Sequence, residues 1–243
     1  MAFHVLEISF PLEYQSPFWK FKPIKFITHF VGHEGPGSLH SYLKKKQWVT
    51  SLNCSDQNLA RGIAMFKVTI HMTPEGFGRS RLVCTKLFNS DLILKPVNHR
   101  SVILAVHKYL ALLRSTKFSR FHHEELVNLS AIQFRFAEKT RPQNYAIWIS
   151  EHMAWPLPVE FLLAGPKQIW EWDSDAEREV GEAKIREYLQ QFRVHESRVF
   201  LMAKKEEHLK INSNITWDKE PWYGTEYSVQ RFDESFIREV RFS

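Results

Sequence analysis

Two histidines have the spacing needed to share one face of a helix and to hold a metal ion. His29 and His33 are the only two of the 12 histidines that stand four residues apart. Neutral imidazole nitrogens at i and i+4 are typical zinc ligands, but two side chains do not complete a zinc site. The spacing therefore favours a pair that packs or hydrogen-bonds on a helix face, with an adventitious two-histidine metal site as the alternative.

The other reactive side chains show no catalytic arrangement. The run of residues 122–125 reads His-His-Glu-Glu, yet neither histidine has a second histidine at i+4, so we interpret the run as a solvated helix start. Cys54 and Cys84 lack CxxC spacing, and nothing near them in the sequence suggests a positioned histidine. We expect two reduced thiols in a cytoplasmic protein. Residues 35–38, Gly-Pro-Gly-Ser, lack the lysine of a phosphate-binding loop and predict a turn followed by a helix cap.

Charge distribution and hydropathy argue against a nucleic-acid partner and a membrane partner. The 243-residue chain carries a net charge of +6, but its basic residues are dispersed, and the only tight cluster is residues 44–46. Because no nucleic-acid motif surrounds this cluster, we interpret it as a solvated helix end and expect no nucleic-acid partner. No apolar run approaches the roughly 18–20 residues of a membrane helix. The first residues also do not form a signal peptide, so we expect no membrane partner.

The elements that must position these side chains follow from hydrophobic periodicity. Alternation predicts strands at residues 4–10, 49–52, 63–72 and 198–203. Helical spacing predicts helices at residues 26–31, 39–46, about 102–113, 121–136, 143–153, 160–163 and 175–192. Strands followed by helices and a returning strand indicate an α+β domain, with helices packed on one face of a mostly antiparallel sheet.

Three segments in the same order along the chain carry a family resemblance. Residues 29–39 read HFVGHEGPGSL, residues 134–136 and 141–142 read FRF and RP, and residues 220–227 read EPWYGTEY. Together they resemble the second, non-zinc-binding domain of the insulinase/pitrilysin-type zinc metallopeptidases, including their fungal members. The resemblance implies a companion domain over residues 1–215 and an extension toward the family's third domain over residues 216–243.

Two features depart from the family pattern. A strand begins almost at Met1, so we expect the domain to be truncated at its N-terminus and to lack the opening strand and helix. Residues 78–99 have no clear period and no counterpart in the relatives. We interpret this segment as translated intron sequence, with a solvated surface loop as the alternative.

The family's catalytic chemistry is expected to be absent from this chain. It depends on an H-x-x-E-H helix in the first domain, which holds zinc and supplies the general base. Here Gly32 stands at the position of the base, and Arg135 stands where the downstream ligand would be. A glycine cannot accept a proton, and a guanidinium cannot ligate zinc. We therefore expect no zinc in this chain and no catalysis by it alone.

The resemblance also implies a site that anchors a peptide substrate as an added strand. The matching positions are His29, Gly32, Glu34, Leu52, Asn53 and Cys54. Glu34 would pair with the peptide's free amine and Gly32 would allow close backbone approach, although the family has small glycine-like residues where this chain has Asn53 and Cys54. The implied partners are a peptide and a zinc-carrying peptidase domain. Alternatives are a subunit of a split metallopeptidase, active only with a zinc-carrying partner chain, and a stand-alone peptide-binding module.

Overall fold

A four-stranded antiparallel sheet forms the centre of the structure. The structure, a computed structural model, describes residues 3–78 and 98–241. The sheet has the order β2-β3-β1-β4, and its strands are β1 (Val5–Leu12), β2 (Val49–Ala60), β3 (Ile63–Met72) and β4 (Arg198–Met202). Every pairing between these strands is antiparallel. Within the described chain, β2 and β4 are therefore the edges of the sheet.

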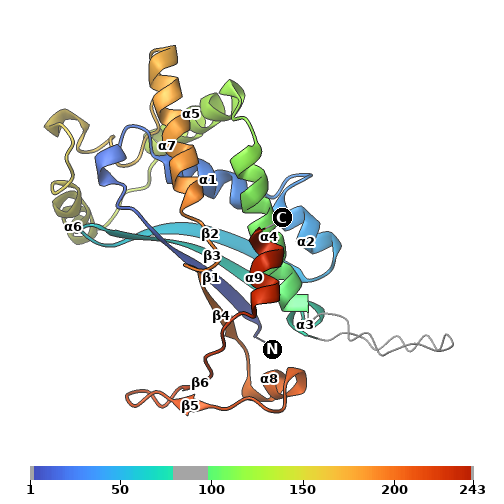
Figure 1. The fold of residues 1–243 in the computed structure, drawn as a ribbon. Coiled ribbons are helices and arrows are strands. Elements are labelled where there is room, and N and C mark those ends of the chain that lie inside the picture. Colours follow the sequence, from blue (N-terminus) through green and yellow to red (C-terminus); the bar gives the residue numbers. More distant parts are fainter. Residues whose placement is uncertain (1–2, 79–97, 242–243) are drawn as a thin grey trace.

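Helices cover one face of this sheet, as Figure 1 shows. The covering helices are α1 (Pro23–Val31), α2 (Leu39–Lys45), α4 (Asn98–Ser115) and α7 (Asp175–Gln190). The remaining elements are η1 (Ser16–Phe18), α3 (Pro74–Phe77), α5 (Arg120–Arg135), α6 (Pro142–His152), η2 (Val159–Phe161), α8 (Lys205–Ile211), β5 (Asp218–Lys219), β6 (Glu226–Tyr227) and α9 (Glu234–Arg241). The prediction of an α+β fold with helices on one face of an antiparallel sheet is confirmed. Among the described residues, no helix has the length and apolar content that a bilayer crossing requires.

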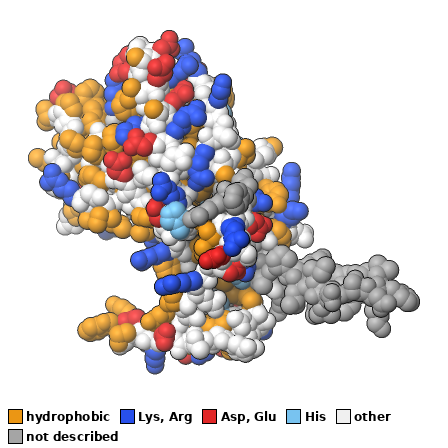
Figure 2. All heavy atoms as spheres, viewed as in Figure 1, with side chains coloured by type: hydrophobic (Ala, Val, Ile, Leu, Met, Phe, Trp, Pro, Cys, Tyr) orange, Lys and Arg blue, Asp and Glu red, His pale blue; other side chains and the backbone are white. Residues whose placement is uncertain are grey.

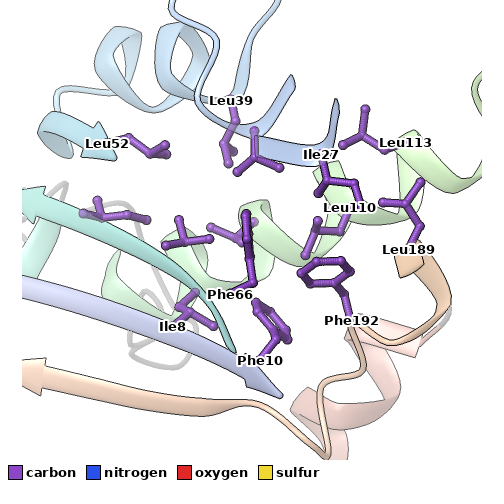
Figure 3. Packing of buried hydrophobic residues seen from close by; sticks show 14 of the residues in the cluster. Ile8, Phe10, Ile27, Leu39, Leu52, Phe66, Leu110, Leu113, Leu189 and Phe192 are labelled. Carbon is purple, nitrogen blue, oxygen red and sulfur yellow. The ribbon is translucent and has the colours of Figure 1, made fainter. Parts of the chain in front are cut away.

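Alternation along the strands places the hydrophobic core between the sheet and the helices. Phe10 of β1 lies opposite Phe66 of β3, and both side chains are fully buried. The ring of Phe192, which follows α7, meets each of them edge-to-face with centroids 5.1 Å apart. Figure 3 shows these three rings together, with Ile27 of α1 and Leu110 of α4 nearby. Edge-to-face contacts of this kind add to the free energy gained by burial alone.

Local sequence signals explain where α1 and α2 begin. Pro23 occupies the first turn of α1, where its fixed φ suits the helix and its missing N–H is not needed. The helix therefore starts three residues before the predicted residue 26. Ser38 caps α2, since its hydroxyl oxygen accepts a hydrogen bond from the backbone N–H of Ser41 at 3.1 Å. The predicted N-cap is confirmed.

Tertiary pairing extends the edge strand beyond its predicted end. β2 continues to Ala60 because it pairs with β3 along almost its whole length, in a hairpin that turns at Gly62. Gly62 has a φ of +90°, which glycine adopts without steric cost. The short pair of β5 and β6 and the helices α8 and α9 were not predicted. The prediction for residues 78–99 falls mainly on residues 79–97, which lie outside the described residues.

Replacement of Phe66 by alanine tests the central ring cluster. Phe66→Ala should lower the free energy of unfolding by about 3–5 kcal/mol, because it removes a fully buried ring and leaves a cavity. Phe200→Ala is the matched control. Phe200 also lies in the sheet but is 49% exposed, so its loss should cost less than about 1 kcal/mol. Urea unfolding followed by circular dichroism measures both, and equal losses would contradict the placement of the core.

Candidate functional site

A groove lies between the C-terminal end of α1 and the edge strand β2. It encloses a cavity of about 370 Å³, and its lining residues are Thr28, His29, Gly32, His33, Glu34, Leu52, Asn53 and Cys54. All six residues of the predicted anchoring site are among them. Thr28 and His33 were not predicted as part of the site. Their positions, four residues before Gly32 and four after His29, are the helical spacing that could have revealed them.

The register of β2 determines which side chains face the helix. Leu52 and Cys54 lie opposite the fully buried Ile70 and Val68 of β3, so their side chains point to the helix-covered face. Asn53 is exposed and alternates to the other face, which leaves mainly its backbone to line the groove. Among the described strands β2 pairs only with β3, so its outer backbone N–H and C=O groups have no strand partner.

Gly32 allows α1 to approach β2 closely. Its φ of −83° is ordinary, so no unusual backbone angle requires glycine here. A Cβ atom at this position would lie 3.0 Å from the Cys54 sulfur and 3.0 Å from the carbonyl oxygen of Thr28. At these distances the thiol or the carbonyl group would have to shift by a few tenths of an ångström. Gly32 is the C-cap of α1, and the atoms that approach it belong to the chain itself, so the predicted approach of a peptide backbone to Gly32 stays a prediction.

The Cys54 thiol joins the two sides of the groove. Its sulfur donates a hydrogen bond to the carbonyl oxygen of Thr28 at 3.2 Å. Burial raises the pKa of this thiol to about 12, and the nearby charge of Asp56 adds to the shift. Because the thiolate is the nucleophile, a thiol with so high a pKa serves as packing and as a hydrogen-bond donor.

The two spaced histidines lie side by side at the end of α1, with ring centroids 5.9 Å apart. His29 is half-buried with its Nε2 atom 3.7 Å from a carboxylate oxygen of Glu125, while His33 is exposed. Burial lowers the pKa of His29 and outweighs the opposing effect of Glu125, while His33 and His122 lower it further. Gly32 offers no base between the two rings. In the part of the chain that is described, no three His, Cys, Asp or Glu side chains converge to hold an ion.

Glu34 ends the groove with an unpaired carboxylate. Its side chain is exposed and forms no ion pair or hydrogen bond with any other described residue. Lys25 and Asp56, by contrast, neutralise each other near the opposite end of α1, with nitrogen and oxygen 2.9 Å apart. The groove therefore has one free negative charge, which can receive a cationic group such as an amine.

The predicted solvated helix start at residues 122–125 is wrong for one residue. His123 is buried, its ring stacks on Trp172 at a centroid distance of 3.8 Å, and its Nε2 atom is 3.0 Å from the carbonyl oxygen of Trp170. Burial lowers the pKa of His123 more than this backbone contact raises it. Its neighbour Glu124 is exposed and pairs with Arg120 at 2.8 Å, as a solvated helix start would.

Comparison with known proteins adds family information to this geometry. Residues 134–243 match the family described as the middle or third domain of peptidase_M16. A nardilysin-like protein of Arabidopsis thaliana is 28% identical over 228 residues, which cover 92% of this chain and 19% of the relative. Insulin-degrading enzyme of Homo sapiens is 28% identical over 221 residues, which cover 91% and 18%. The chain thus spans about a fifth of the length of the curated relatives it matches.

Solved structures share the fold. The crystal structure of pitrilysin superposes with a TM-score of 0.76 at 20% identity, covering 100% of this chain and 22% of that one. The inactive peptidase domain of a putative zinc protease from Bordetella parapertussis superposes with a TM-score of 0.56 at 10% identity, covering 84% of this chain and 95% of that domain.

The reactivity of Cys54 tests the packing of the groove. With a pKa of about 12, only about one thiol in 10⁴ is ionised at pH 8, so alkylation by iodoacetamide should be at least about a hundredfold slower than for a free thiol. The rate is measured by mass spectrometry in a Cys84→Ser background, so that a single thiol remains. Denaturation in urea should restore the free-thiol rate. Equally fast alkylation of the native protein would contradict the packing of Cys54 against α1.

Proposed function

Because the chain belongs to the insulinase/pitrilysin-type family of zinc metallopeptidases, we propose that it is the second, non-zinc-binding domain of such an enzyme. In this role it anchors a peptide substrate and forms part of the wall of the substrate chamber, and it does not perform catalysis. The observation that carries the proposal is the convergence of His29, Gly32, Glu34, Leu52, Asn53 and Cys54 on one groove beside a free sheet edge.

Anchoring proceeds by strand addition. A peptide laid against the outer edge of β2 exchanges backbone hydrogen bonds with residues 52–54, and these bonds give affinity with little dependence on sequence. Alternate side chains of the peptide then point toward α1, on the same face as Leu52 and Cys54. The others point away from α1, on the same face as Asn53. The peptide's N-terminal amine lies at the end of the groove, where it pairs with the carboxylate of Glu34.

Zinc chemistry does not fit the side chains of this site. A catalytic zinc needs three protein ligands and a base near the bound water. Here Gly32 takes the position of the base, and Arg135 is exposed near the end of α5. We therefore assign the zinc to a separate domain or chain, and we derive no catalytic step from the residues of this one.

A surface around α6 favours a second role, which is docking to a zinc-carrying peptidase domain or chain. Large apolar side chains are exposed on α5, α6 and the segment after α6, and these are Ile132, Phe136, Ile147, Met153, Val159 and Leu163. Val159, for example, is 81% exposed. Figure 2 shows hydrophobic side chains gathered on the side of the molecule where Figure 1 places α6. Apolar surface of this kind favours a domain with a partner, or a subunit of a split peptidase, over a stand-alone module.

Removal of the Glu34 charge tests the anchoring. A fluorescent peptide with a free amine should bind the 243-residue chain, and Glu34→Gln should weaken the affinity about tenfold, because the amine loses its charged partner. Acetylation of the peptide should have a similar effect on the wild-type chain and little further effect on Glu34→Gln. Fluorescence anisotropy measures the affinities.

Glu179→Gln on α7 is the matched control, since it removes the same charge from an exposed position outside the groove. Mass spectrometry should recover the peptide uncleaved in the presence of zinc. Equal affinities for the free and acetylated peptides would overturn the role of Glu34.

A further inference from the structure

A second cavity adjoins the groove and shares Glu34 with it. It has a volume of about 330 Å³, and its lining residues are Glu34, His40, Ser41, Lys44 and Lys45. Four of these residues belong to α2, so their positions follow from a single capped helix. Glu34 lies between the two cavities, and a group that contacts its carboxylate is within reach of both.

The cavity is lined by one negatively charged residue, Glu34, and two positively charged ones, Lys44 and Lys45, and none of the three forms an ion pair with a described residue. All three side chains are exposed. Lysines in the last turn of a helix are favoured by the helix dipole, which accounts for a basic residue there without any ligand. It does not account for the unpaired carboxylate on the other side of the same cavity.

His40 is the most deeply buried residue of this lining. Its side chain lines the cavity but is only 6% exposed, and its Nε2 atom has no hydrogen-bond partner. A buried polar atom without a partner is rare in native proteins and costs about 1–3 kcal/mol.

We propose that this cavity binds the side-chain carboxylate of an N-terminal aspartate or glutamate whose amine is held by Glu34. The proposal rests on the proposed anchoring function and specifies its substrate class as peptides with an acidic first residue. The amine pairs with Glu34, and the side-chain carboxylate accepts hydrogen bonds from Lys44 and Lys45. An N-terminal aspartate or glutamate carries the positively charged amine and the negatively charged side chain on one residue. Because Glu34 lines both cavities, the amine can pair with Glu34 while the side chain enters the adjoining cavity.

Two peptides that differ only in their first residue test this assignment. A peptide that begins with aspartate should bind the full chain about fivefold more tightly than the same peptide with the isosteric asparagine, because only the first carries the second charge. The double variant Lys44→Gln, Lys45→Gln should lose this preference. Lys46→Gln is the control, since Lys46 belongs to the same basic run but does not line the cavity. Fluorescence anisotropy at low and at high salt measures the ratio, which should fall toward one as salt rises.

The outcomes separate this inference from the anchoring function. Equal affinity for the two peptides, with acetylation still weakening both, would overturn the acidic-residue site and leave anchoring intact. A preference that survives in the double variant would overturn the role of the two lysines. If neither peptide binds the wild-type chain, the anchoring function and the inference that rests on it both fail.

Discussion

The contact between Gly32 at the end of α1 and Cys54 on β2 determines the geometry of the whole site. No side chain larger than hydrogen fits at Gly32 without moving the thiol or the carbonyl of Thr28. The thiol in turn bonds to that carbonyl, so helix and strand are held at one separation. This separation sets the width of the groove and places Glu34 at its end. The hydrophobic core stabilises this contact, because Ile27 of α1 and Leu52 of β2 both bury their side chains in the core.

The electrostatics of the groove follow from the same close packing. Burial keeps the Cys54 thiol protonated and lowers the pKa of His29, so neither side chain brings a charge into the groove near neutral pH. The exposed Glu34 is left as the negative charge at the end of the groove, and the two lysines of α2 lie across the adjoining cavity. A neutral groove with charges at one end suits a peptide that is recognised by its backbone and its terminus.

Local signals in the sequence explain which parts of the fold could be predicted. The cap at Ser38 and the alternation along β3 depend on residues close in sequence, and both are confirmed. The second half of β2 is polar without clear alternation and becomes a strand only through its pairing with β3. The burial of His123 depends on Trp172, which is distant in sequence, so no local pattern could reveal it. Family resemblance predicted six of the residues that line the groove, whereas the cavity beside α2 needed side-chain positions in three dimensions.

Amide hydrogen exchange along β2 tests strand addition most directly, since it reports on the edge that the peptide is proposed to cover. Exchange is measured by NMR on the full chain, with and without a saturating peptide that has a free amine. The account predicts that alternate amides in residues 51–57, those on the outer side of the strand, exchange more slowly when the peptide is bound, while amides of the other edge strand, β4, do not change. Peptide binding that leaves the β2 amides unchanged, or that protects β4 instead, would contradict it.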